Sequence, residues 1–381
     1  MKNHILFILL ISTFNCAFSQ IEILSNQYGY ITAMDKILVL KSQGELLDNS
    51  VAVFKDEVLV SNDTLIFNGN KEGNAIYGVN LSSIRESSDY MLKFEDSSSE
   101  FSIKKNPYSS LYLDLHKSVL STVSSEYSEE NLRQLLSLMY TSFTDTTFSS
   151  NDDLIMKLLG HVSDIHSILD DKTINKEKNI KSLLLASTCM SLASFAEQKI
   201  EVKRSRATLA MKLYIKAVEN EEIKENLDLK GVAAFQLYLI FKDPSHLKEL
   251  IHVLDKMLWP QDFKSEDMRL YFLIHFANVY NITDGFLVKN VDLGIHVEKS
   301  IVSNTPKIYN QEQMIDYSLS CLYTFQAVKD VKYLEQLIAG LNYMSGLNIN
   351  GINYFHRILK EGSMSDKRKL LLLLNNISLM N

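Results

Sequence analysis

Ile23-Leu-Ser-Asn-Gln-Tyr-Gly-Tyr30 decides the fold, because it opens a strand-rich segment in a chain whose remainder has helical periodicity. From Ile21 to about Lys105, short runs rich in β-branched and aromatic residues follow a period of two. Turn formers such as Asn68-Gly69-Asn70 and Ser97-Ser-Ser99 separate these runs. Short strands divided by such turns predict a β-sandwich over residues 20–105.

Residues 1–19 have the three parts of a secretory signal peptide. These parts are a polar start, an apolar core and a small-x-small cleavage site, at Lys2 with His4, Ile5–Ile11 and Ala17-Phe18-Ser19. The mature chain would begin at Gln20 and be exported to the periplasm, the cell surface or the medium. The apolar core is too short for a permanent membrane span. Thr13-Phe14-Asn15 before Cys16 departs from the lipoprotein pattern, so no lipid anchor is expected.

Asn106-Pro107 ends the strand pattern, since proline disfavours helix at the preceding residue and fits a first helical turn. Beyond it, apolar residues recur at helical spacing, for example at Leu132, Leu135, Leu136 and Met139. About a dozen such segments follow, without the fixed sequence repeat of a helical solenoid. The pattern predicts an all-helical domain over residues 106–381.

Composition excludes some partners. The formal net charge of −7 argues against nucleic acid, because phosphate binding requires a basic stripe. Two short basic runs, Lys203-Arg204-Ser205-Arg206 and Lys367-Arg368-Lys369, are interpreted as solvated helix ends. Cys189 and Cys321 are the only cysteines after the leader; an oxidising compartment would permit a disulfide, but two buried thiols are the favoured state. No cofactor is expected.

Four segments carry a family resemblance. Asn26-Gln27-Tyr28-Gly29-Tyr30 stands at the start of the sandwich, while Arg206–Tyr214 and Gly231–Tyr238 lie in paired helices. The most specific is Leu341-Asn-Tyr-Met-Ser-Gly-Leu-Asn-Ile-Asn-Gly-Ile-Asn-Tyr-Phe355. Together they resemble the family 9 glycoside hydrolases, which include many endoglucanases. The last segment follows that family's D-Y-x-L-G-x-N-P-x-G-x-S-Y-V pattern, with its glycines, asparagine and tyrosine at Gly346, Gly351, Asn348 and Tyr354, but with Asn342 and Ile349 replacing aspartate and proline.

The resemblance implies a multidomain β + α fold, in which an N-terminal immunoglobulin-like β-sandwich precedes an α/α toroid-like domain of twelve helices. It also implies inverting hydrolysis, which needs a carboxylate base and a carboxylic acid about 6.5–9.5 Å apart. The family supplies its base from an Asp-Ala-Gly-Asp motif after the first toroid helix. It supplies its acid from a glutamate near the C-terminus.

Neither catalytic motif is found in this sequence. Only Ser121–Glu130 separates the first two helical segments, and it contains no aspartate or glycine. Its acids, Glu126, Glu129 and Glu130, are interpreted as a helix start after Ser128. Glu361 is a candidate surviving acid, although a solvated loop residue is the favoured interpretation. We therefore assign no catalytic residue and predict a non-catalytic relative with a carbohydrate-binding or scaffold role.

Two rival hypotheses stay open. The first is an active hydrolase of β-glucan-type polysaccharides with relocated carboxylates, for instance Asp114, Asp145, Asp152 or Asp153. Two carboxylates facing each other across an open cleft would favour it. The second is a protein that binds a structural partner through the β-sandwich, which an exposed apolar patch on that domain would favour.

Candidate substrate-binding residues are Trp259, Tyr354, His356 and Arg357. Trp259 is the only tryptophan, and a helix-end core position is its alternative interpretation. His356-Arg357 follows the glycine-containing segment where the family carries a His-His-Arg motif; an exposed helix start is the alternative. No metal site is expected at His161, Asp164 and His166, because the two histidines are five positions apart and lie on different helix faces.

Overall fold

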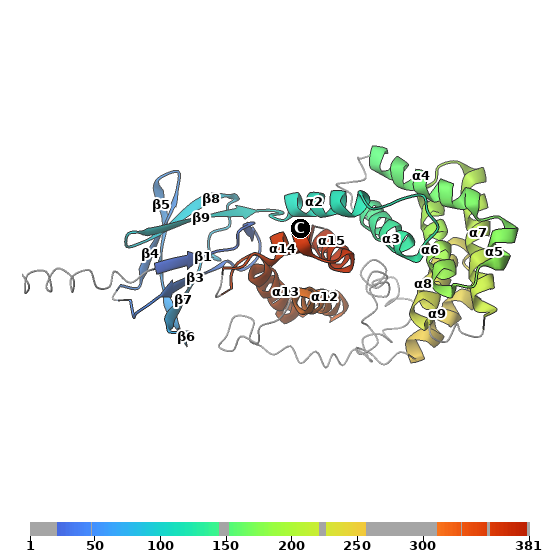
Figure 1. Cartoon of the computed structure of the whole chain (residues 1–381). Coiled ribbons are helices and arrows are strands. Elements are labelled where there is room, and N and C mark those ends of the chain that lie inside the picture. The colour runs from blue at the N-terminus through green and yellow to red at the C-terminus, as the bar shows by residue number, and fades with distance from the viewer. Residues whose placement is uncertain are drawn as a thin grey trace, which may run out of the picture. The chain divides into compact units, whose positions relative to one another are not determined.

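The computed structural model describes residues 21–46, 48–144, 152–220, 226–256, 311–328, 330–348 and 351–378 (Figure 1). These residues divide into two compact units. The first contains the strands up to Tyr108 together with Ile338–Phe355. The second contains the helices from Ser109 onward, with the last of them beginning after Phe355. A segment near the C-terminus thus completes the N-terminal unit.

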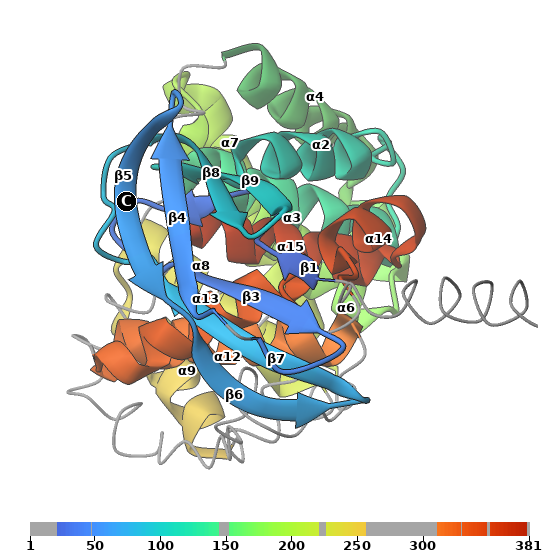
Figure 2. The ribbon, with the colours of Figure 1, turned by 90° about the vertical axis from the view of Figure 1, so that its left-hand side faces the viewer.

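The strands of the first unit form two sheets that enclose one core (Figure 2). One sheet has the order β1-β3-β7-β6, and the other has the order β2-β9-β8-β4-β5. All neighbours are antiparallel except β2 and β9. The strands are β1 (Ile21–Leu24), β2 (Tyr30–Ile31), β3 (Ile37–Ser42), β4 (Ser50–Lys55), β5 (Val58–Thr64), β6 (Ile66–Lys71), β7 (Asn74–Asn80), β8 (Ser88–Phe94) and β9 (Ser97–Lys104).

The core of the sandwich follows from the alternation in the sequence. In β3 every second residue is buried, so that Leu38 and Leu40 point inward. Val51, Val53 and Leu92 meet them from the other sheet. A half-buried strand with one apolar face requires this arrangement, and the predicted β-sandwich is confirmed.

The Asn26–Tyr30 stretch forms the tight connection between β1 and β2. Gly29 has a φ of +103°, and a Cβ there would lie 2.8 Å from the Ser102 carbonyl oxygen, so no other residue fits without strain. The buried Tyr30 hydroxyl donates to the Ile37 carbonyl at 2.7 Å and accepts from the Asn26 amide at 3.1 Å. These bonds fix the direction in which the chain enters the sandwich.

The Asn26 side chain joins three distant parts of the first unit. Its Nδ2 donates to the Tyr108 hydroxyl and to the Asn342 Oδ1, both at 2.8 Å, while its Oδ1 accepts from the Tyr28 amide at 3.0 Å. Rings of Tyr28, Tyr108 and Phe355 pack around this group, with centroids 5.6–6.0 Å apart. The segment from Asn342 to Phe355 is therefore docked on the N-terminal stretch.

The helical unit confirms the predicted change of period after Asn106-Pro107. The structure describes twelve helices in all. They are α2 (Ser109–Leu120), α3 (Glu129–Thr144), α4 (Asp152–Ile168), α5 (Asp171–Lys176), α6 (Ile180–Ala196), α7 (Ile200–Val218), α8 (Leu227–Phe241), α9 (Pro244–Lys256), α12 (Gln311–Val328), α13 (Val331–Met344), α14 (Tyr354–Glu361) and α15 (Met364–Ser378). Residues 257–310 of the predicted toroid-like domain lie outside the described residues.

Helix α6 forms the centre of its unit, because almost its whole surface is buried. Cys189 on α6 and Cys321 on α12 are both buried thiols that are not joined in a disulfide, as predicted. The structure contradicts the interpretation of Arg206 as part of a solvated helix end. Its side chain is buried and pairs with Glu197 at 3.0 Å, while Nη2 donates to Ser163 Oγ at 2.8 Å. No helix among the described residues combines the length and apolarity of a membrane span.

His116 of α2 is buried beside α3, with its Nε2 3.2 Å from the Ser142 Oγ. Burial disfavours the imidazolium and lowers the pKa of His116 from 6.5 to about 4. The folded protein therefore holds this side chain neutral at the pH where an unfolded chain would already be partly protonated.

The first prediction concerns the acid stability of the helical unit. Because unfolded His116 binds a proton more readily than folded His116, its stabilising contribution is full above pH ~6.5 and is lost as the pH falls towards 4. The free energy of unfolding should drop by about 3 kcal/mol over this window through His116 alone. His116→Gln should flatten the pH dependence measured by urea denaturation. An unchanged slope in the variant would contradict the assignment.

The second prediction concerns Asn26. Asn26→Ala removes a buried amide and leaves the Tyr108 hydroxyl and the Asn342 side chain without this partner, which should cost about 2–4 kcal/mol. The loss should appear in denaturation of the full mature chain. Asn62→Ala, at an exposed position of β5, is the matched control and should change stability by less than about 0.5 kcal/mol. Equal effects of the two substitutions would refute the proposed role.

Candidate functional site

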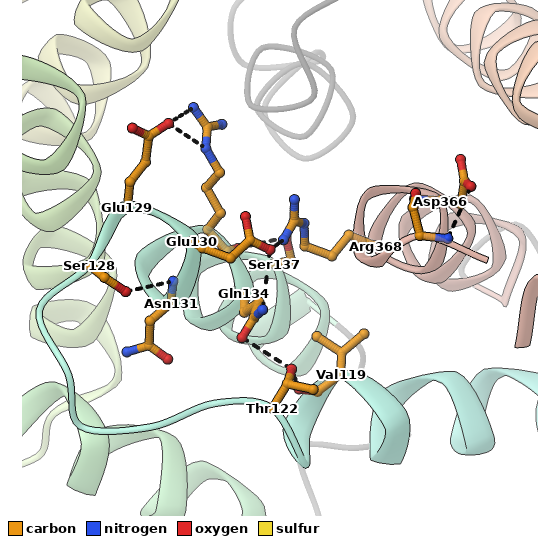
Figure 3. A network of polar contacts seen from close by, with 12 residues as sticks. Val119, Thr122, Ser128, Glu129, Glu130, Asn131, Gln134, Ser137, Asp366 and Arg368 are labelled. Carbon is orange, nitrogen blue, oxygen red and sulfur yellow. Dashed lines mark hydrogen bonds and ion pairs between the residues drawn. The ribbon is translucent and has the colours of Figure 1, made fainter. Parts of the chain in front are cut away.

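The linker between α2 and α3 stands where the family resemblance places the catalytic base. Asn131, in the first turn of α3, holds this linker in place (Figure 3). Its buried side chain donates to the carbonyls of Ser124 and Glu126, both at 2.7 Å, and accepts from the Ser124 amide at 2.8 Å. The Ser128 hydroxyl accepts from the Asn131 amide at 3.4 Å, which confirms the predicted helix start.

Glu130 forms an ion pair with Arg368 of α15 across the end of this linker (Figure 3). The Arg368 Nη1 donates to the Glu130 Oε1 at 2.6 Å, and Gln134 donates to the same oxygen at 3.2 Å. The Arg368 side chain is only 4% exposed, whereas that of Glu130 is 58% exposed. A nearly buried cation thus reaches a carboxylate at the surface.

The pair fixes the protonation state of Glu130. Burial alone would raise the pKa of Glu130, but the hydrogen bond and the charge of Arg368 outweigh burial and lower that pKa below its ordinary value. A general acid needs a raised pKa to carry a proton at neutral pH, and a low pKa also weakens a general base. Glu130 therefore has the electrostatics of a structural carboxylate.

Three consecutive cations of α15 contact three different helices. Lys367 Nζ donates to Ser118 Oγ of α2 at 3.3 Å, Arg368 reaches α3, and Lys369 Nζ lies 3.2 Å from the Asp316 Oδ1 of α12. Arg368 and Lys369 are buried, so the expectation of a solvated helix end is wrong for these two residues. Their burial could not be predicted from the sequence, because a run of basic residues shows no apolar periodicity.

The start of α15 is fixed by a reciprocal cap. The Ser363 hydroxyl accepts from the Asp366 amide at 3.1 Å, and the Asp366 carboxylate accepts from the Ser363 amide at 3.3 Å. The cap sets the direction of the first turn from which Arg368 extends. The two regions to which the resemblance assigns acid and base are thus joined by Arg368 and Glu130.

The other candidate acids are at the surface. Glu361 is the last residue of α14, is exposed, and lies 3.6 Å from the Arg357 Nε one turn earlier. Asp114 on α2 is exposed and lies 3.9 Å from Lys117 Nζ. Asp153 is exposed at the start of α4. Asp145 and the side chain of Asp152 lie outside the described residues, so the hypothesis of relocated carboxylates stays a prediction.

The candidate substrate-binding residues differ in exposure. Tyr354 begins α14 within the first unit; it is buried, and its ring stacks on Tyr343 with centroids 5.7 Å apart. His356 and Arg357 lie in the first turns of α14 and are exposed. Trp259 lies outside the described residues. A sugar-binding role for these residues stays a prediction.

The histidines near the linker face different partners, as their spacing predicted. His161 Nδ1 lies 3.4 Å from the Ser125 Oγ, and Asp164 accepts a hydrogen bond from the same hydroxyl. His166 Nε2 instead lies 3.4 Å from the Ser205 Oγ on α7. Among the described residues, no three histidine, cysteine or acidic side chains are grouped as a metal site.

The fold has clear counterparts among solved structures. A family 9 glycoside hydrolase from Bacteroides ovatus has a TM-score of 0.66 at 12% identity, over 94% of this chain and 99% of that chain. A metagenome-derived family 9 endoglucanase has a TM-score of 0.68 at 9% identity, with the same coverage. A thermostable endoglucanase from Alicyclobacillus acidocaldarius has a TM-score of 0.61 at 11% identity, over 87% of this chain and 83% of that chain.

Neither a protein-family model nor a curated protein sequence matches the chain. The structural likeness nevertheless extends over nearly the whole of it. The resemblance noted in the sequence is confirmed at the level of the fold: a β-sandwich followed by a helical domain, as in the family 9 glycoside hydrolases.

The third prediction tests the ion pair of α15. Glu130→Gln keeps the shape of the side chain but removes a negative charge 2.6 Å from the buried Arg368 cation, and should lower the free energy of unfolding by about 1–3 kcal/mol. Glu129→Gln is the matched control, because Glu129 pairs with Arg133 four residues later in the same helix; this change should cost about 0.5 kcal/mol or less. A Glu129 variant as unstable as the Glu130 variant would refute the distinction.

Proposed function

We propose that this chain is an exported, non-hydrolytic protein of the family 9 glycoside hydrolase fold, and that it binds polysaccharide without cleaving it. The leader over residues 1–19 directs export. Binding, not bond cleavage, is the role of the helical domain.

The ion pair between Glu130 and Arg368 is the observation that carries the proposal. Inverting hydrolysis requires two carboxyl groups with different pKa values, one of which must hold a proton. At the place where the resemblance puts the base, the linker is tied by Asn131, and the carboxylate of Glu130 at its end is paired with Arg368. At the place of the acid, Glu361 is exposed beside Arg357. The ion pair lowers the pKa of Glu130, so this carboxyl is unsuited to hold the proton that hydrolysis requires and is weakened as a base.

The solved counterparts support polysaccharide as the ligand class. Three of the structures with this fold are endoglucanases or family 9 hydrolases, and another is described as a complex with cellobiose-like isofagomine. The candidate contacts in this chain are His356 and Arg357, with Tyr354 and Trp259 as further candidates. An exposed imidazole and guanidinium can donate to sugar hydroxyls.

The fourth prediction tests cleavage and binding on one sample. Purified Gln20–Asn381 should release no reducing sugar from a panel of β-glucans, with a family 9 endoglucanase as the positive control. The same sample should be pulled down by insoluble cellulose. The double variant His356→Ala, Arg357→Ala should weaken the pull-down, whereas Lys360→Ala, an exposed change on the same helix, should leave it unchanged.

Two results would overturn the proposal. Sugar release that disappears after substitution of one aspartate or glutamate would establish an active hydrolase with relocated carboxylates. Absence of pull-down by cellulose and by every glucan of the panel would remove the binding role.

A further inference from the structure

The hairpin of β4 and β5 projects an apolar tip from the sandwich. Its turn consists of Asp56 and Glu57, both left-handed with φ of 49° and 65°, as in the tight two-residue turns of β-hairpins. β5 is the last strand of its sheet, so one side of its backbone has no neighbouring strand there (Figure 2). The tip is an exposed element at the edge of its sheet.

Three consecutive large apolar side chains after this turn are exposed. Val58, Leu59 and Val60 are 65%, 49% and 45% exposed. A β-bulge causes this exposure, since Phe54 pairs with Leu59 while Val53 pairs with Ser61, which leaves Val60 as an extra residue on β5. The remaining exposed apolar residues of the described chain are an adjacent pair on β6 and single positions on helices. The tip is therefore the apolar patch that a partner-binding sandwich would show.

The edge of β5 is only partly protected against pairing. Natural edge strands are shielded by lysine, proline or a β-bulge; β5 has the bulge at Val60, but its sequence from Val58 to Thr64 contains neither lysine nor proline. An open edge of this kind can accept an extended segment through main-chain hydrogen bonds, with side-chain contacts adding specificity.

The charges around the tip select the kind of partner. Asp56 and Glu57 form the apex and Asp63 follows in β5; none of the three makes an ion pair with another described residue. The cations nearby are engaged, since Lys55 pairs with Glu86 and Lys93 Nζ lies 4.8 Å from the centre of the Phe54 ring. The tip thus presents exposed apolar side chains with acidic residues before and after them in the sequence.

We propose that the β4–β5 hairpin docks an extended protein segment that combines apolar β-forming residues with basic residues. A second copy of this chain fits less well. Antiparallel pairing of two β5 strands about Val60 would bring Glu57 of one copy opposite Asp63 of the other, and like charges in that position are destabilising. A lipid surface fits less well too, because the two acids at the apex would have to enter it first.

The fifth prediction uses a labelled probe peptide, Lys-Val-Thr-Val-Lys-Val-Thr-Val-Lys, and the full mature chain. Fluorescence anisotropy should detect binding that weakens with salt. The same peptide with glutamate in place of lysine should bind at least about tenfold more weakly. Leu59→Thr with Val60→Thr should weaken the basic peptide by about tenfold, and Asp56→Asn with Glu57→Gln should reduce both the affinity and its salt dependence.

Ile200→Thr is the matched control, since Ile200 is an exposed apolar residue on α7 of the helical unit. The Ile200→Thr variant should bind the basic peptide with the same affinity as the unaltered chain. All substituted positions are exposed or lie in the turn, so circular dichroism and melting should be unchanged. Absence of binding, equal binding of both peptides, or binding indifferent to the hairpin variants would overturn the proposal. A dimer that dissociates in the Leu59→Thr, Val60→Thr variant would also overturn it, in favour of self-association.

Discussion

The amide of Asn26 is the interaction on which the first unit depends. One buried side chain bonds to Tyr108, 82 positions away, and to Asn342, 316 positions away. Each partner is itself buried, so a missing bond would leave a buried polar group with one hydrogen-bond partner fewer. The entropy of closing so long a loop is offset by the aromatic packing of Tyr28, Tyr108 and Phe355 around the same point. The sandwich is complete only when the segment near the C-terminus has docked.

Helix α15 has the corresponding role in the second unit, where ion pairs take the place of the amide hydrogen bonds of Asn26. Its consecutive cations reach α2, α3 and α12, and two of them are buried. Buried cations are tolerated only with partners, because desolvation is costly and one unpaired charge is worse than none. The positions of Glu130 and Asp316 are therefore tied to Arg368 and Lys369. Arg368 lowers the pKa of the Glu130 carboxyl and so favours its ionised form.

Sequence periodicity predicted the features that depend on a single helix or strand and on residues next to it in the sequence. The strands, the change to helix after Asn106-Pro107, the start of α3 after Ser128 and the two buried thiols all followed from local patterns. Burial of Arg206, Arg368 and Lys369 did not, because the carboxylates or carbonyls that compensate them lie on other helices. The linker shows the same limit: its missing aspartate and glycine could be read directly, but the hold of Asn131 on its carbonyls required coordinates.

The Glu130–Arg368 pair also supports the proposed separation of the fold from hydrolysis. Active sites keep carboxyl groups in environments that shift pKa values apart, and such groups usually cost stability. Here the same region has a short tied linker and a neutralised carboxylate, which are stabilising features. On the proposed non-hydrolytic function, an acid–base pair at this place would need more than one new carboxylate: the Arg368 cation would have to be removed, and its buried site would then need apolar filling. Such a change would disturb the packing of α15, which contacts α2, α3 and α12.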